Sequence, residues 1–225
     1  MTFDGCADRY EEELARGLSV TGESMAYYAR ERLGWVRRLV ERDGVDVKRV
    51  LDFGCGVGHA TPYIFASLNA TEVTGADVSA RSLERAREQY GSLRARFVSP
   101  EDAQGPFDLA FTNGVFHHIA PAQRAAAVRF VFDALRPGGV FAFWENNPWN
   151  PGTRYIMSRV SFDKDAITLT PPEARAMLRA GGFEVRRTHS RFYFPRILSG
   201  LRNLEPILSR IPLGGQYLVW CRRAS

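Results

Sequence analysis

Long apolar runs are missing from this sequence. A helix that crosses a bilayer needs about 20 consecutive apolar residues, whereas the apolar runs here are only a few residues long. The N-terminus, MTFDGCADRYEEE, also lacks the apolar stretch of a secretory signal peptide. These absences argue against an integral membrane segment and predict a soluble, cytoplasmic protein.

Cysteine is scarce as well. The three cysteines, Cys6, Cys55 and Cys221, are scattered and include no CxxC pair. Such a set favours reduced thiols and supports neither a disulfide framework nor a zinc site. We therefore expect no metal centre in this chain.

Lysine is almost absent, since it supplies only two of the 30 basic residues. The net charge of +5 and the pI near 9.4 are compatible with a polyanionic partner. However, the arginines are spread along the chain rather than gathered in one tract. The sequence therefore predicts no nucleic-acid partner.

The size of the chain suits one hydrophobic core. It has 225 residues, of which 45% are hydrophobic, and this length demands no second domain. We expect a single domain over residues 1–225. Within it, residues 1–46 form an N-terminal helical segment, 47–146 a ligand-binding core, and 147–225 two insertions with the last strands.

Hydrophobic periodicity divides the chain into alternating helices and strands. Residues 24–42 predict an amphipathic helix, and five strand-like stretches follow with helices between them. These stretches are RVLDF, EVTGADVS, ARFVS, FDLAFTNGVF and VFAFWE. We expect the helix before VFAFWE to begin at Pro121 and to end at Pro137, Gly138 and Gly139.

Capping residues mark two further helices. Ser79 and Gly91 bound the helix after the second strand, and Thr170 with Glu173 predicts a capping box for PPEARAMLRA. Two strands, FEVRRTHSRFYF and GGQYLVWCRR, close the chain. This order predicts an α/β, Rossmann-like fold. We expect seven strands in a mostly parallel sheet, helices on both faces, and a terminal antiparallel strand pair.

A glycine-rich turn follows the first strand. In VLDFGCGVG, Gly54, Gly56 and Gly58 allow a ligand to approach the backbone where a helix begins. A dinucleotide-binding GxGxxG pattern would need glycine at His59, and the Gly-Lys-Ser/Thr of a Walker A loop is missing. Nineteen residues after Gly58, Asp77 ends the second strand, where such sheets place a carboxylate that binds ribose hydroxyls.

Four motifs, in order, resemble those of the class I S-adenosylmethionine-dependent methyltransferases. They are DFGCGVG, GADVS, FDLAFTNGVFHHI and LRPGG, within residues 48–145. The resemblance implies that S-adenosylmethionine is the cofactor. It also implies the residues that bind this donor: the three glycines under its methionine part, Asp52 near its amino group, Asp77 on the ribose, Val78 against the adenine, Asp102 at the adenine amino group, and Asn113 through its backbone carbonyl. Glu101 is an alternative to Asp102.

The acceptor side is expected beyond the carboxyl ends of the fourth and fifth strands. His117, His118 and Glu145 are the candidates for a general base there, with Asn146 and Asn147 beside them. The alternative for each histidine is that it packs in the core between strand and helix. Glu145 is expected either to pair with a neighbouring residue or to face the acceptor cavity. Four aromatic residues are candidates for the cavity wall: Tyr27, Tyr28, Trp149 and Tyr155.

The insertion over residues 195–214 has apolar residues on one side at helical intervals, interrupted by Pro206. Its apolar side needs a cover: the domain's own core, a second subunit, or a lipidic acceptor and its membrane. We expect a lid that helps to wall the acceptor cavity. Because arginines flank the apolar stripe, peripheral contact with an anionic membrane surface is left open.

The resemblance implies methyl transfer to an oxygen, nitrogen or carbon atom of a small molecule, such as a specialised metabolite or a lipid or glycan precursor. One alternative is a non-catalytic domain that binds S-adenosylmethionine. The other is a protein or nucleic-acid methyltransferase, which would be expected to carry an NPPY-like tetrapeptide or an appended basic domain, and TNGVFHH has neither. The oligomeric state is left open.

Overall fold

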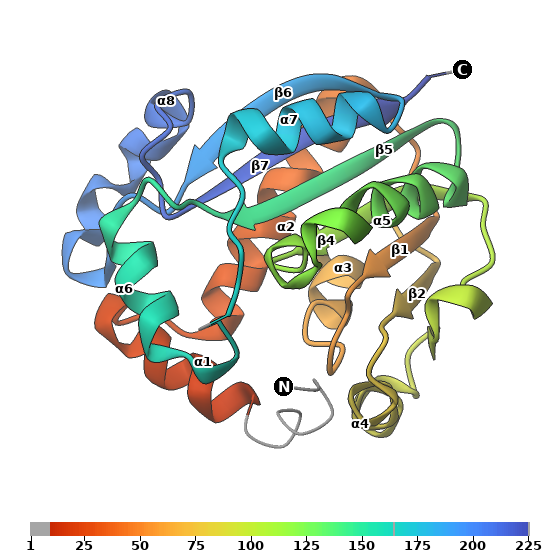
Figure 1. The fold of residues 1–225 in the computed structure, drawn as a ribbon, viewed down its shortest axis with the longest axis horizontal. Helices are drawn as coiled ribbons and strands as arrows, with labels where there is room; N and C mark the ends of the chain where they lie inside the picture. The colour runs from red at the N-terminus through yellow and green to blue at the C-terminus, as the bar shows by residue number, and fades with distance from the viewer. Residues whose placement is uncertain (1–9, 164, 225) are drawn as a thin grey trace.

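The computed structural model describes residues 10–163 and 165–224, which form a seven-stranded sheet with helices on both faces (Figure 1). The strand order is β3-β2-β1-β4-β5-β7-β6. The strands are β1 Arg49–Phe53, β2 Glu72–Ala76, β3 Ala95–Val98, β4 Phe107–Asn113, β5 Leu135–Asn146, β6 Phe183–Arg191 and β7 Gln216–Arg223.

Eight α-helices and several short 3-10 turns join the strands in the described part of the chain. The α-helices are α1 Tyr10–Leu18, α2 Met25–Asp43, α3 Thr61–Ser67, α4 Ala80–Tyr90, α5 Pro121–Ala134, α6 Pro151–Arg159, α7 Pro171–Ala180 and α8 Glu205–Leu208. The 3-10 turns are η2 Ser19–Thr21, η3 Pro100–Asp102, η4 Phe116–His118, η5 Ser161–Asp163 and η6 Arg196–Leu204. None of these described helices is both long and apolar enough to cross a bilayer.

The pairing of the strands confirms the predicted fold class. β1 pairs in parallel with β2 and β4, and the parallel ladder continues to β3 on one side and β5 on the other. β7 is antiparallel to both of its neighbours, β5 and β6. The terminal antiparallel pair is thus β6 and β7, with the last strand inserted between β5 and β6.

The two faces of the sheet bury different helices. Along β5, Phe141 and Phe143 belong to the cluster that includes α5 and α7, whereas Ala142 and Trp144 belong to the cluster that includes α2 and α3. In Figure 1, α5 and α7 lie in front of the sheet and α2 and α3 lie behind it. This alternation follows from the period of two in a strand, and it explains why VFAFW is apolar without interruption.

The caps expected from the sequence are present. The Ser79 side chain accepts from the Ser82 N–H at the start of α4, and Gly91 is the C-cap of this helix. Thr170 and Glu173 form the complete capping box of α7. The predicted helix over 24–42 is α2, which begins after Ser24.

The predicted end of the helix that begins at Pro121 was wrong. This helix, α5, ends at Ala134, and β5 begins at Leu135, which pairs with Phe107 of β4. The ladder then shifts its register before Val140 pairs with Leu109. The Pro-Gly-Gly sequence therefore lies in an irregular part of the strand, because the backbone of Leu135 pairs with β4 and its side chain is buried in the core.

Asp108 connects three strands at the edge of the sheet opposite the carboxyl ends. Its carboxylate accepts from the Lys48 and Arg49 N–H groups at 2.9 and 2.8 Å and from Arg136 Nε at 2.6 Å. Partial burial opposes ionisation, but the Arg49 N–H, the Arg136 side chain and the Lys48 N–H hold the pKa of Asp108 below its usual value. The ionised form of Asp108 is therefore more stable in the folded chain than in water.

We predict that Asp108→Ala lowers the free energy of unfolding at pH 7 by about 1–2 kcal/mol, because the Lys48 and Arg49 N–H groups and the Arg136 side chain lose a charged acceptor. Since the folded pKa is depressed, this stabilisation is present above pH 4 and is lost as the pH falls through the folded value. Urea denaturation at pH 7 and pH 3 measures it. The control is Asp46→Ala, because Asp46 is 76% exposed in its ion pair with Lys48. Equal losses in the two variants would contradict the role of Asp108.

Candidate functional site

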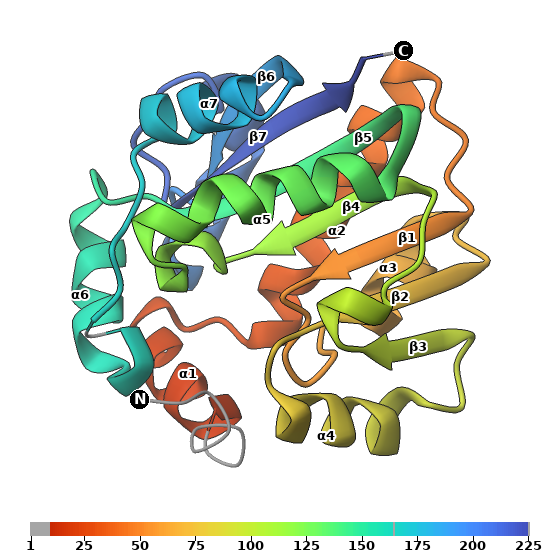
Figure 2. The ribbon, with the colours of Figure 1, turned by 45° about the vertical axis from the view of Figure 1, so that its right-hand side comes forward.

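A cavity of about 1000 Å³ lies at the carboxyl ends of β1, β2, β4 and β5. Figure 2 shows α1 and α6 facing the arrowheads of β1 and β4. The loops that follow these strands form one side of the cavity, and α1, α2 and α6 form the other. The strand ends place the predicted site residues here, because parallel strands all end at the same edge of the sheet.

The glycine turn after β1 needs its glycines for two reasons. Gly54, Gly56 and Gly58 all have positive φ, at 73°, 52° and 79°, a region that other residues rarely adopt. A Cβ at Gly54 would lie 2.4 Å from Val115. By contrast, a Cβ at Gly56 would meet no described atom within 4 Å. The turn thus leaves its backbone open to a ligand at Gly56.

Asp77 fastens the end of β2 to the glycine turn. Its carboxylate accepts from the Gly56 N–H at 2.8 Å and from the Ser79 N–H at 2.9 Å. These two bonds fix its orientation at the cavity wall, and each carboxylate oxygen has two lone pairs with which to accept hydrogen bonds. The next residue, Val78, also lines the cavity and is 80% exposed. A carboxylate and an apolar surface therefore adjoin each other at this end of the cavity.

Asp52 is a buried carboxylate at the end of β1. It lines the cavity, and its Oδ2 has no hydrogen-bond partner among the described residues. Burial, and then the charge of Asp77, raise the pKa of Asp52 to about 7. A buried carboxylate without a partner is unfavourable, so this position suits a ligand group that is cationic or donates hydrogen bonds.

Three further predicted residues lie at the ends of β3 and β4. Asn113 lines the cavity, and within the described chain its buried Oδ1 lacks a hydrogen-bond partner. Asp102 accepts from Ser99 Oγ at 3.0 Å and lies outside the cavity wall, whereas Glu101 lies in it. Of the two alternatives for the adenine contact, Glu101 is the one that faces the cavity.

The three candidate bases lie together but face different surroundings. His117 and His118 belong to η4 and line the cavity, whereas Glu145 of β5 is fully buried behind His117. His117 Nδ1 lies 2.7 Å from Glu145 Oε2. Of the two alternatives for Glu145, pairing with a neighbour is the one observed.

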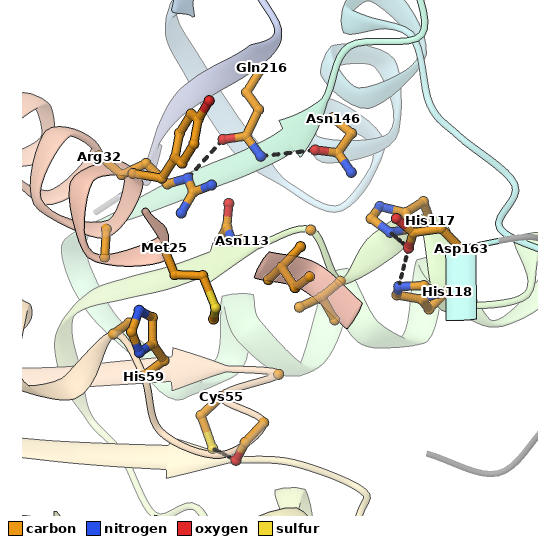
Figure 3. A pocket seen from close by; sticks show the side chains of 18 of the residues that line it. Met25, Arg32, Cys55, His59, Asn113, His117, His118, Asn146, Asp163 and Gln216 are labelled. Atoms are coloured by element: carbon orange, nitrogen blue, oxygen red, sulfur yellow. Dashed lines mark hydrogen bonds and ion pairs between the residues drawn. The ribbon is translucent and has the colours of Figure 1, made fainter. Parts of the chain in front are cut away.

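A fourth polar side chain, Asp163 of η5, joins the two histidines (Figure 3). Its Oδ1 lies 3.4 Å from His117 Nε2 and 3.3 Å from His118 Nε2. Burial opposes charging of His117, but Glu145 and Asp163 raise its pKa to about 10. Burial likewise opposes ionisation of Asp163, but both histidines hold its pKa low. The sequence had no signal for Asp163, because it lies in an insertion far from η4 along the chain.

The opposite wall holds a second polar group, contributed by α2. Arg32 Nε donates to Gln216 Oε1 at 2.7 Å, and Gln216 Nε2 donates to Asn146 Oδ1 at 2.9 Å (Figure 3). The guanidinium also packs over Tyr28 and Phe192. No motif in the sequence singles out Arg32, and the packing of α2 across the strand ends brings it to the cavity.

Of the four aromatic candidates for the cavity wall, three lie in the wall and one does not. Tyr27, Tyr28 and Tyr155 line the cavity, and Trp149 lies outside it. Asn147 is likewise away from the cavity, because its Nδ2 donates to the carbonyls of Pro212 and Gly214.

The predicted lid over residues 195–214 was wrong. Only Pro195 of this segment reaches the cavity, which is instead covered by Leu14 and Leu18 of α1 and by Ile156 of α6. Glu205 ties the segment to the N–H groups that follow β6, so it lies on the outer surface. Its apolar side chains remain exposed, to 90% at Ile197. Peripheral contact with a membrane stays a prediction.

Comparison with known proteins gives one consistent family. A family model described as "Methyltransferase domain" matches residues 51–141. An uncharacterized methyltransferase, sll0829 of Synechocystis sp., is 34% identical over 152 residues, which are 63% of this chain and 69% of that protein. A trans-aconitate 2-methyltransferase of Rhodopseudomonas palustris (strain BisB18) is 31% identical over 126 residues, but this chain spans only 46% of its length.

A solved structure extends the likeness of the fold to almost the whole chain. The TehB-like SAM-dependent methyltransferase from Corynebacterium glutamicum has a TM-score of 0.63 and covers 98% of this chain and 99% of its own. At 18% identity, this likeness concerns the fold.

We predict that Asp52→Asn makes the ligand-free chain more stable than wild type at pH 8, by roughly 2–4 kcal/mol, and brings little change at pH 4. The pKa of Asp52 in the folded chain is raised to about 7. The contribution of Asp52 to stability is therefore fully present below pH 4, where Asp52 is protonated in both states, and it is lost as the pH rises through 7. Urea denaturation at pH 4, 6 and 8 measures the difference. Asp46→Asn is the exposed control. A difference that does not change with pH would contradict the raised pKa.

Proposed function

The chain belongs to the class I S-adenosylmethionine-dependent methyltransferases, and from this membership we propose that it methylates an oxygen, nitrogen or carbon atom of a small molecule. The observation that most supports a small-molecule acceptor is that α1 and α6 lie over the cavity. The two helices cover part of the side opposite the strand ends with Leu14, Leu18 and Ile156. A macromolecular acceptor would need an open cleft at this place.

The residues of the glycine-turn end suit S-adenosylmethionine. The unpartnered Asp52 carboxylate would receive the amino group of the methionine part, and the open side of Gly56 would lie under it. Asp77 would accept from the ribose hydroxyls, and Val78 would pack against the adenine. Gly54 and Gly58 would shape the turn rather than contact the donor, because their missing side chains face other residues.

Two donor contacts depend on loops. We assign the adenine amino group to Glu101, in preference to Asp102, because Glu101 lines the cavity. Asn113 would offer its backbone carbonyl to the amino group of the donor, as the resemblance implies. Its buried side-chain oxygen adds a second acceptor at the same strand end.

The volume of the cavity supports a small acceptor. Ligand pockets commonly measure about 300–1000 Å³, and this cavity of about 1000 Å³ can hold the donor with a compact acceptor beside it. The Rhodopseudomonas relative is named for a small acid, trans-aconitate. We extend to this chain only the small size of the acceptor, because the match covers less than half of that relative.

The donor supplies an electrophilic methyl group on a sulfonium, so the protein's residues need to hold a nucleophile in line and exclude water. We propose that the acceptor lies between two polar groups of the cavity wall, one formed by His117, His118 and Asp163, the other by Arg32 and Asn146. His118 would contact the acceptor atom that is methylated, and His117, whose ring nitrogens face Glu145 and Asp163, would support it from the cavity wall. Glu145 acts as a positioning residue, since it reaches the cavity only through His117.

We predict that Asp77→Ala weakens the binding of S-adenosylmethionine and of its demethylated product by about 10- to 150-fold, or 1.5–3 kcal/mol, because hydrogen bonds to a charged acceptor are lost. Calorimetry measures both affinities. Asp46→Ala is the exposed control, and Asp77→Asn tests whether the charge matters once the shape is kept. Unchanged affinity in Asp77→Ala would remove Asp77 from the donor site, and binding of NAD to the wild type would overturn the assignment of the glycine turn.

We also predict that isotope from methyl-labelled donor passes into the small-molecule fraction of a metabolite extract and not into its protein or nucleic acid. His118→Gln should lower the rate about 100-fold while donor affinity stays nearly constant, because only the acceptor contact is changed. His189→Gln is the matched control, since His189 is buried beside Trp35 and outside the cavity.

Each other outcome points to a different function. Label in protein or nucleic acid would support a macromolecular acceptor. If no fraction is labelled by a chain that binds the donor tightly, the non-catalytic alternative gains support. A normal rate in His118→Gln would remove this histidine from the acceptor site.

A further inference from the structure

The polar group at the acceptor end contains the donor atoms of a metal site. His117, His118 and Asp163 each offer one ligand atom, and these atoms all lie within 4.8 Å of one another. We propose that they bind one divalent transition-metal ion of the Zn²⁺ type. A role of this ion in orienting the acceptor rests on the proposed function, whereas its binding to the chain does not.

Two of the three distances within the group match the spacing of ligands around such an ion, and all three ligand atoms lie within 4.8 Å of one another. A tetrahedral ion with bonds of about 2.0–2.1 Å holds its ligand atoms roughly 3.3–3.4 Å apart. Asp163 Oδ1 lies 3.4 Å from His117 Nε2 and 3.3 Å from His118 Nε2. Two imidazole nitrogens and one carboxylate oxygen form a ligand set that Zn²⁺ and its neighbours in the first transition row accept.

His117 is held in the orientation of a ligand. Its Nδ1 lies 2.7 Å from the buried Glu145 Oε2, so Nδ1 is the nitrogen that donates and Nε2 is directed at Asp163. A carboxylate that receives the second ring N–H of a histidine is the usual partner of a metal-binding imidazole, because it fixes the tautomer and makes the ring a better ligand. This arrangement explains why an acidic residue, Glu145, lies near the end of the otherwise apolar stretch of β5.

Two of the ligand atoms lack ordinary partners. The side chains of His117 and Asp163 are 2% and 7% exposed. Over the described part of the chain, His117 Nε2 and Asp163 Oδ1 are buried without a hydrogen bond. Their ion pair alone satisfies them incompletely, whereas a cation between them would bind both atoms directly.

The remaining coordination position would face the acceptor. All three ligand residues line the cavity, so a hydroxyl or carboxyl oxygen of the acceptor can complete the coordination of the ion. A bound divalent ion lowers the pKa of a coordinated hydroxyl and so favours the nucleophilic form. The expectation of no metal rested on the cysteines, which carry no information about a histidine and aspartate site.

The test measures metal binding in the absence of any acceptor. The full chain, freed of metal and of any affinity tag, is titrated with Zn²⁺ by calorimetry and with Co²⁺ by its visible absorption. We expect one ion per chain and tetrahedral Co²⁺ bands. His118→Ala and Asp163→Ala should weaken Zn²⁺ binding at least about 100-fold, and Glu145→Gln, which leaves the ligands in place, by about 10- to 100-fold. His189→Gln should bind like wild type.

Binding of the demethylated donor product checks that each variant folds, and Asp163→Asn replaces Asp163→Ala if the latter does not fold. The proposal is overturned if the wild type binds no Zn²⁺ at a concentration of about 100 μM. It is also overturned if folded Asp163 and His118 variants bind as well as wild type, because the group is then an ion-pair cluster. A chain that binds Zn²⁺ and transfers no label overturns the proposed function alone.

Discussion

The parallel register of β1 with β2 and β4 decides where the groups of this site lie. Phe53 pairs with Ala76, so β1 and β2 end at the same level. The Gly54 and Cys55 N–H groups then donate to the Ala76 carbonyl, which continues the ladder into the turn. Because the turn is bound to the neighbouring strand, Asp52, Gly56 and Asp77 meet at one point. A shift of one residue in this register would separate them.

The buried charges of Glu145 and His117 oppose the stability of the core in which they lie. Burying an ion pair seldom adds stability, because desolvation offsets the attraction between the charges. Glu145 nevertheless lies among apolar strand residues, and among the described residues its Oε2 contacts His117 while its Oε1 has no hydrogen-bond partner. We interpret this pair as a device that orients the His117 ring, since packing alone would favour an apolar residue there.

The helices added at the N-terminus and in the two insertions lie in different places relative to the cavity. α1 and α6 cover the cavity, and their mutual packing depends on close approach at Gly17, where a Cβ would lie 2.8 Å from Val160. The segment Arg196–Leu204 with α8 instead lies outside, tied down by Glu205 and by Arg202, which pairs with Glu23. Apolar side chains in the first case line the cavity, and in the second they remain on the surface.

The sequence by itself determined the fold class, the caps of α4 and α7, and the glycine turn and Asp77 at the ends of β1 and β2. These features depend on residues that are close together in the sequence or on the order of the strands along the chain. Hydrophobic periodicity and the spacing of the glycines make both visible in the sequence. The end of α5, the wall made by α1, and the meeting of Asp163 and Arg32 with the strand ends were decided by tertiary structure. Leu135 joined a strand because β4 offered it backbone partners. Asp163 and Arg32 reached the cavity because separate elements pack across the same edge of the sheet, and no local pattern encodes that packing.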